Sequence, residues 1–132
     1  MAPTLVFDMK PDGSMGAFKM ATGSPGGATI IQYVSKTLVG ALDWGLNAQQ
    51  ATSMVDFGAS NSPTTNVGGE HPHISGADDP LVKALEAMGH TVSTNAQSSG
   101  IGTVLRIQDK GQAALEGGAD PRREGLALGD AL

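Results

Sequence analysis

The chain has 132 residues, a formal net charge of −5 and no cluster of lysine or arginine. This charge excludes nucleic acid as the main partner, because affinity for nucleic acid depends on neutralising phosphates. The absence of cysteine excludes a disulfide framework and a thiolate zinc site. The length indicates one domain or part of one, and the 19 glycines indicate many tight turns.

The chain opens with a predicted β-hairpin. Residues 4–8 and 17–22 have strand character, and Pro11-Asp12-Gly13 supplies the turn within a long loop. The second strand leads into Gly23-Ser24-Pro25-Gly26-Gly27, called here the glycine turn. This turn connects the hairpin to the strongest helical pattern in the chain.

Two helices are predicted after the glycine turn. The first covers residues 28–43 and carries an apolar stripe that we expect to pack in the core, made of Ile30, Val34, Leu38 and Leu42 with Ile31 and Ala41 beside them. Asn47 and Gln50 form a capping-box pattern that begins a short second helix, ending near residue 55. The short connection predicts that the two helices are neighbours.

The second half of the chain mixes irregular and regular segments. Residues 56–78 have no clear period and are predicted to be irregular, with one short strand at 65–67. Asp79 as N-cap, Pro80 at the first helical position and Gly89 after the end predict a third helix. Further strands are predicted at 91–94, 103–107 and 113–116, with a hairpin turn at 109–111 and coil over 117–132. This order predicts an α+β fold in which helices cover an antiparallel sheet.

The glycine turn is the first candidate site, because a strand that turns through glycines into a helix presents free N–H groups at the positive helix end. Such a turn binds a phosphate or the oxyanion formed when an acyl group is attacked. It lacks the Gly-Lys-Ser/Thr and G-x-G-x-x-G patterns of nucleotide loops. Ser24 lacks the nucleophile-elbow pattern, since Thr22 stands where glycine is needed. A purely structural turn remains an alternative.

Two other polar clusters allow a functional and a structural interpretation. His71 and His73 lie on the same side of an extended segment, with Asp78 and Asp79 nearby in sequence, which suggests a metal site. Solvated loop histidines are the favoured interpretation, because no firm third ligand is present. The segment Asp120-Pro121-Arg122-Arg123 would either clamp an anion or hold the tail through an ion pair between an arginine and a neighbouring carboxylate, which is favoured.

Six segments in order resemble the C-terminal part of the γ-glutamyltranspeptidase small subunit. They are Met1-Ala2-Pro3-Thr4, Gly23-Ser24-Pro25-Gly26-Gly27, Leu42-Asp43-Trp44-Gly45-Leu46-Asn47, Ala51-Thr52, Leu85-Glu86-Ala87-Met88-Gly89-His90 and Asp120-Pro121-Arg122-Arg123-Glu124-Gly125. The resemblance implies an N-terminal-nucleophile hydrolase with an αββα sandwich, of which residues 1–132 would be a single partial domain. It also implies periplasmic or secreted localisation.

In this family a precursor cleaves itself, and the threonine freed at the start of the small subunit attacks a γ-glutamyl amide such as that of glutathione. The resemblance implies that Gly26 and Gly27 supply the oxyanion hole. No threonine of this chain, including Thr4, takes the place of the nucleophile. We therefore expect an inactive fragment whose partners are the rest of the small subunit and the large subunit, and which self-associates through exposed apolar surface. No cofactor and no metal are expected.

One departure affects the expected substrate. The family usually has an Asn-Ala-Pro-Arg-aromatic-His-His run after the second helix, whereas this chain has Ser53-Met54-Val55-Asp56-Phe57-Gly58-Ala59. Replacement of the arginine by Asp56 leaves the γ-glutamyl specificity open. A divergent acylase of another amide and a non-catalytic α+β interaction module are the alternatives.

Overall fold

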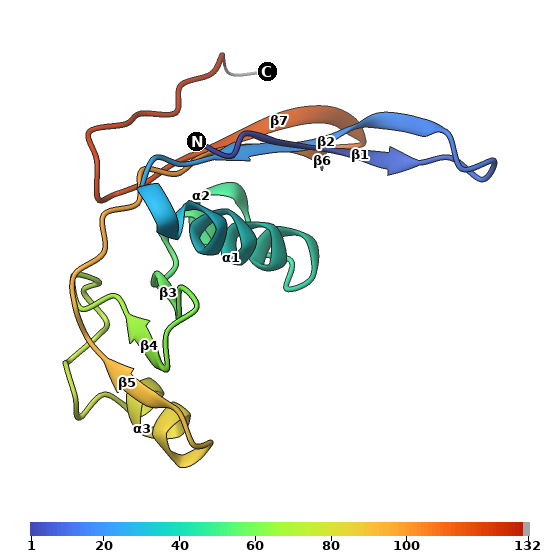
Figure 1. Cartoon of the computed structure of the whole chain (residues 1–132). Helices are drawn as coiled ribbons and strands as arrows, with labels where there is room; N and C mark the ends of the chain where they lie inside the picture. The colour runs from blue at the N-terminus through green and yellow to red at the C-terminus, as the bar shows by residue number, and fades with distance from the viewer. Residues whose placement is uncertain (131–132) are drawn as a thin grey trace.

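The computed structural model describes residues 1–130 and has an α+β fold (Figure 1). Its main sheet is antiparallel with the strand order β1-β2-β6-β7, formed by β1 (Thr4–Met9), β2 (Met15–Gly23), β6 (Gly102–Asp109) and β7 (Gln112–Ala119). Two helices, α1 (Ile30–Leu42) and α2 (Ala48–Ser53), pack against one face of this sheet. The prediction of helices on an antiparallel sheet is confirmed.

A second, smaller sheet lies beyond the two helices (Figure 1). It contains β3 (Phe57–Gly58), β4 (Thr64–Val67) and β5 (Thr91–Ser93), and α3 (Pro80–Ala87) joins β4 to β5. The β4 and β5 strands are parallel, which an intervening helix allows. The prediction of an irregular segment at 56–78 missed β3, because two residues are too few to show an alternation. The predicted strand at 65–67 is β4.

The predicted helix starts and the tight turn are confirmed by their hydrogen bonds. The side chain of Asn47 accepts from the N–H of Gln50 while the Gln50 side chain accepts from the N–H of Asn47, so the capping box is complete. The Asp79 carboxylate accepts from the N–H of Leu81 at 2.9 Å. Lys110 and Gly111 both have positive φ, 48° and 83°, and connect β6 to β7 in a two-residue turn.

The apolar stripe predicted for the first helix is only partly buried. Ile30 and Val34 belong to the core, but Leu42 is 38% exposed and Ile31 is 72% exposed. The buried face of α1 instead contains Lys36, whose side chain has a charged partner inside the protein. A spacing rule based on apolar residues cannot detect a helix face that is buried through an ion pair.

The prediction of coil from residue 117 onward is wrong at its start, because β7 continues through Gly117 and Gly118 to Ala119. A Cβ on Gly118 would lie 2.4 Å from the carbonyl oxygen of Ala48. Both glycines therefore belong to the strand, and the absence of a side chain at Gly118 lets α2 approach β7 closely. Residues 131–132 of the predicted coil lie outside the described residues.

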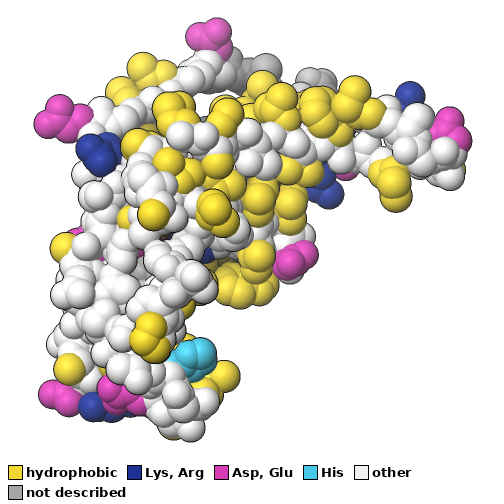
Figure 2. Space-filling view, viewed as in Figure 1, with side chains coloured by type: hydrophobic (Ala, Val, Ile, Leu, Met, Phe, Trp, Pro, Cys, Tyr) yellow, Lys and Arg dark blue, Asp and Glu magenta, His cyan; other side chains and the backbone are white. Residues whose placement is uncertain are grey.

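The other face of the main sheet carries exposed apolar side chains. Leu5 is 65% exposed, Val104 38% and Leu115 67%. The backbone register places Leu5 and Val104 on the same face, since both are aligned with Ala21. Figure 2 shows apolar side chains along the strands of this sheet. Among residues 1–130, no helix has the length and apolar character required to span a bilayer.

Candidate active site

The glycine turn leaves β2 at Gly23 and enters a short 3₁₀ turn, Gly27–Thr29, directly before α1. Gly26 has φ 139° and Gly27 has φ 60°, both in the region that favours glycine. A Cβ on Gly26 would lie 2.5 Å from Cε2 of Tyr33, whereas a Cβ on Gly27 would meet no atom within 4 Å. Gly26 is thus required by conformation and by space, and Gly27 by conformation alone.

The N–H groups of both glycines are available to a ligand. In the described part of the chain, neither the N–H of Gly26 nor that of Gly27 donates a hydrogen bond. The carbonyl oxygen of Gly26 accepts from the N–H of Thr29 at 3.3 Å and from its hydroxyl at 2.8 Å. Two free donors at the positive end of a helix can stabilise a developing oxyanion.

Ser24 has a structural role in this turn. Its hydroxyl donates to the carbonyl oxygen of Pro25 at 2.7 Å and accepts from the N–H of Gly100 at 3.0 Å. Its side chain is buried, with 1% of the residue exposed. Within residues 1–130, no carboxylate or imidazole hydrogen-bonds to this hydroxyl, so the arrangement gives Ser24 no base with which to act as a nucleophile.

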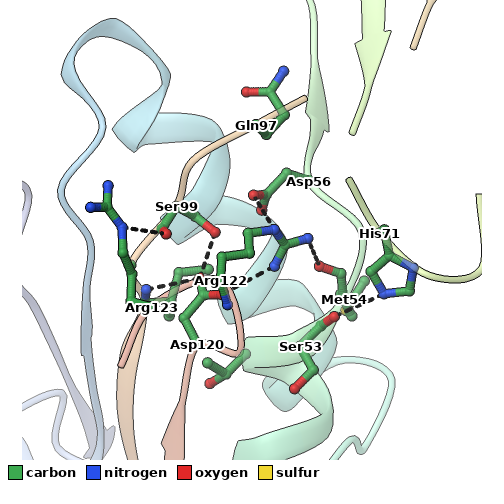
Figure 3. A network of polar contacts seen from close by, with 12 residues as sticks. Ser53, Met54, Asp56, His71, Gln97, Ser99, Asp120, Arg122 and Arg123 are labelled. Atoms are coloured by element: carbon green, nitrogen blue, oxygen red, sulfur yellow. Dashed lines mark hydrogen bonds and ion pairs between the residues drawn. The ribbon is translucent and has the colours of Figure 1, made fainter. Parts of the chain in front are cut away.

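A largely buried group of ion pairs is centred on Arg122 and is called here the Arg122 network (Figure 3). The Nε of Arg122 lies 2.6 Å from Oε1 of Glu70 and 3.2 Å from Oδ2 of Asp56. Its Nη1 lies 3.2 Å from Oδ1 of Asp120, and Nη2 donates to the carbonyl oxygen of Met54 at 3.1 Å. The favoured prediction, an arginine paired with a neighbouring carboxylate, is confirmed for Arg122.

The fifth member of the Arg122 network is Lys36, which pairs with Asp56. Burial lowers the pKa of Lys36, although the neighbouring carboxylate of Asp56 acts in the opposite direction. Burial would raise the pKa of Asp120, but hydrogen bonds from the N–H of Ile101 and the hydroxyl of Ser99 outweigh it and hold this pKa below its usual value. These hydrogen bonds favour the ionised form of Asp120, which is the form that pairs with Arg122.

Glu70 connects the Arg122 network to the loop after β5. Its Oε2 accepts from the N–H of Gln97 at 2.7 Å. Burial would raise the pKa of Glu70, but this bond and the Arg122 guanidinium together lower it. Arg123 does not join the ion pairs, since its guanidinium donates to the carbonyl oxygens of Ser98 and Ser99. Each of the three nitrogens of the Arg122 guanidinium donates a hydrogen bond within the protein, which favours a role in holding the segment after β7 over the clamping of an external anion.

His71 and His73 line a cavity of about 670 Å³ beside the Arg122 network. Nε2 of His71 lies 3.0 Å from the carbonyl oxygen of Ser53, and its Nδ1 accepts from the N–H of His73 at 3.2 Å. Both ring nitrogens are therefore occupied by the backbone. No group of three or more metal-ligating side chains is found in residues 1–130. A metal at His71 would have to displace one of these backbone contacts.

Residues missed by the sequence interpretation are Lys36, Glu70 and Tyr33. Lys36 was detectable in principle. Asp56 replaces an arginine that is usual in the family, and a buried aspartate needs a cationic partner. A lysine on an otherwise apolar helix can be that partner. Glu70 and Tyr33 gave no sequence signal. Their roles depend on contacts with Arg122 and Gly26, which are 52 and 7 residues away along the chain.

Comparison with known proteins is consistent with this geometry. The family model described as gamma-glutamyltranspeptidase matches residues 1–130. The chain is 30% identical over 131 residues to the glutathione hydrolase proenzyme of Bacillus subtilis (strain 168), covering 98% of this chain and 20% of that protein. It is 33% identical over 122 residues to the glutathione hydrolase proenzyme of Escherichia coli (strain K12), covering 92% and 19% respectively.

The fold agrees with a solved structure of a variant of the gamma-glutamyltranspeptidase from Pseudomonas nitroreducens. The TM-score is 0.74 at 21% identity, and the match covers all of this chain and 62% of that chain. The helix-covered antiparallel sheet of this chain therefore has the α+β fold found in that gamma-glutamyltranspeptidase. The chain belongs to the γ-glutamyltranspeptidase family. It spans about a fifth of the length of the curated relatives.

Proposed function

We propose that this chain supplies the oxyanion-binding turn of an enzyme that cleaves or transfers a γ-glutamyl or related acyl amide. The observation that carries the proposal is the pair of free N–H groups on Gly26 and Gly27 at the start of α1. The nucleophile is the N-terminal threonine of a self-cleaved precursor, and it lies outside these 132 residues.

The remaining part of the enzyme covers the exposed face of the main sheet. Leu5, Val104 and Leu115 give this face the apolar character of a surface that packs against another layer. A second sheet on this face would complete an αββα sandwich, with residues 1–132 as its C-terminal portion. The donor is a γ-glutamyl compound such as glutathione, and the enzyme acts in the periplasm or outside the cell.

Asp56 does not contact the acyl donor in this proposal. Its side chain is fully buried and is paired with Lys36 and Arg122. The replacement of the family's arginine by Asp56 therefore changes the ion pairs inside the protein and leaves the contacts to the acyl donor unaffected. A divergent acylase acting on another amide remains the second candidate, and a panel of acyl donors distinguishes it from a γ-glutamyl-specific enzyme.

The test is Gly27→Val in the complete protein, measured as release of a chromogenic amine from a γ-glutamyl anilide. The new side chain meets no atom of this chain and instead fills the space in front of the turn. We expect kcat to fall about 10²- to 10³-fold, as for the loss of one oxyanion donor, because the side chain would keep the oxyanion away from the N–H that residue 27 retains. Unchanged turnover would contradict the oxyanion role.

Gly45→Val is the matched control. Gly45 has φ 68°, close to the 60° of Gly27, and a Cβ there also meets no atom within 4 Å. The two substitutions therefore impose similar backbone strain. Gly45 lies between α1 and α2, away from the glycine turn. An equal loss of turnover in both variants would show that Gly27→Val acts through impaired folding.

A further inference from the structure

The glycine turn is held by contacts at two points that both lead to Arg122. At one point, the N–H of Gly100 donates to Ser24 Oγ, and the neighbouring N–H of Ile101 donates to Asp120 at 3.0 Å. Asp120 in turn pairs with Arg122. The serine contact fixes the residues before the two functional glycines.

At the other point, the ring of Tyr33 lies against Gly26. A Cβ placed on Gly26 would point at this ring and would lie 2.5 Å from its Cε2 and 3.1 Å from its Cδ2. Tyr33 is 2% exposed, and its hydroxyl donates to Oε1 of Gln97 at 2.7 Å. The N–H of Gln97 donates to Glu70, which pairs with Arg122.

We propose that Tyr33 is a positioning residue for the oxyanion-binding turn. Its ring sets the place of Gly26, and its hydroxyl anchors the ring through Gln97 to the Arg122 network. The inference rests on the proposed function for its kinetic consequence, but the support that Tyr33 gives to the backbone can be measured without activity. The geometry also explains the residue type: a phenylalanine would fill the same space without the anchor, and a smaller side chain would leave Gly26 unsupported.

The alternative is that Tyr33 is only a core residue. A structural role predicts that its loss lowers stability without a specific effect on the turn. The control variant is Val82→Ala, since Val82 is 1% exposed and lies in α3, outside the glycine turn and the Arg122 network. Comparing this variant with Tyr33→Leu separates a loss of core packing from a loss of support for Gly26.

The first measurement is ¹⁵N relaxation of the complete protein. Backbone order parameters of Gly26 and Gly27 report motion directly and, unlike chemical shifts, do not change merely because an aromatic ring is removed. We expect Tyr33→Leu to lower both order parameters from about 0.85, typical of rigid backbone, toward 0.6, while Val82→Ala leaves them unchanged. Unchanged order parameters in Tyr33→Leu would overturn the inference.

The second measurement is the steady-state kinetics of the complete protein. Tyr33→Leu is expected to lower kcat about tenfold or more with KM unchanged, because a displaced donor weakens binding of the transition state. Tyr33→Phe should lower kcat less than Tyr33→Leu does, and Gln97→Leu should lower kcat by the same amount as Tyr33→Phe, because both remove the hydroxyl anchor. If the leucine variant at Tyr33 fails to fold, wild-type kcat in both of these variants would overturn the anchoring role.

These outcomes separate the two proposals. Wild-type protein that releases no amine from any acyl donor contradicts the proposed function, while the relaxation data still decide the role of Tyr33. Active wild-type protein with an unchanged kcat in Tyr33→Leu overturns the role of Tyr33 alone.

Discussion

Lys36 and Asp56 form an ion pair that is almost completely buried. The distance from Nζ to Oδ1 is 2.7 Å, and the side chains are 1% and 0% exposed. Lys36 comes from the middle of α1, and Asp56 directly precedes β3. The pair therefore connects the helical layer of the main sheet to the smaller sheet, and Arg122 extends it to the segment after β7.

Lys36→Met is expected to destabilise the protein by about 3–5 kcal/mol, because removing one partner leaves a buried charge without its main compensation. The free energy of unfolding in urea measures this effect. Lys83→Met is the control, since Lys83 is 55% exposed and its contacts to Asp78 and Glu86 are 3.7 and 3.4 Å long. An exposed pair contributes about 0–1 kcal/mol. Similar losses in the two variants would contradict the importance assigned to the buried pair.

Acid is expected to weaken the Arg122 network. The pKa values of Asp120 and Glu70 are lowered in the folded protein. Each carboxylate therefore contributes stability that is fully present above its unfolded pKa, near 3.8 for Asp and 4.5 for Glu, and that is lost as the pH falls toward its folded pKa. Urea unfolding between pH 7 and pH 2 measures this loss.

Asp120→Asn identifies the share of the acid sensitivity that belongs to Asp120. The variant cannot ionise at this position, so its unfolding free energy should fall less steeply between pH 5 and pH 2 than that of the wild type. It should also be less stable at pH 7, because Arg122 loses one of its charged partners. Parallel pH profiles for the two proteins would show that Asp120 does not titrate differently on folding.

Gly118→Ala and Gly117→Ala form a matched pair within β7. A Cβ on Gly118 meets backbone at 2.4 Å, whereas one on Gly117 meets the side chain of Ala127 at 2.8 Å. Backbone of α2 cannot move without disturbing the core, but Ala127 is exposed and lies outside the helices and strands, so it can give way more easily. We expect Gly118→Ala to cost about 1–3 kcal/mol, the usual range for overpacking, and Gly117→Ala to cost less. Thermal denaturation of both variants tests this order, and the reverse order would contradict the packing of α2 on β7.

Zinc is expected to leave thermal stability unchanged. Both ring nitrogens of His71 bond to the backbone, so a metal would have to displace Ser53 or the N–H of His73. A ligand that binds only the folded state raises Tm, and a site occupied at 100 times its Kd adds about 2.7 kcal/mol. Melting curves with zinc and with a chelator provide the test. A zinc-dependent rise that is absent in His71→Ala would establish a metal site.

Local patterns predicted most elements of the fold. The capping box at Asn47 and the Asp79 N-cap were predictable because each is made by residues close in sequence. The parallel pairing of β4 with β5 was not, since it depends on contacts across α3. The end of β7 was missed because the sequence alone does not distinguish a glycine in a closely packed strand from a glycine in a loop.

The candidate site was predictable in part. The glycine turn followed from the strand, glycine and helix order, and its free N–H groups agree with that interpretation. The Arg122 network was predictable only at its local contact, Asp120 with Arg122. Its other members come from distant segments, and a single sequence carries no record of which distant charges meet.

In the proposed function, this chain provides the oxyanion-binding turn and the nucleophile lies elsewhere in the protein. The most direct measurement compares amine release from a γ-glutamyl anilide by the 132-residue chain and by the complete protein. The account predicts no turnover by the chain alone and turnover by the complete, self-cleaved protein. Turnover by the chain alone would place the nucleophile within these residues and contradict the account.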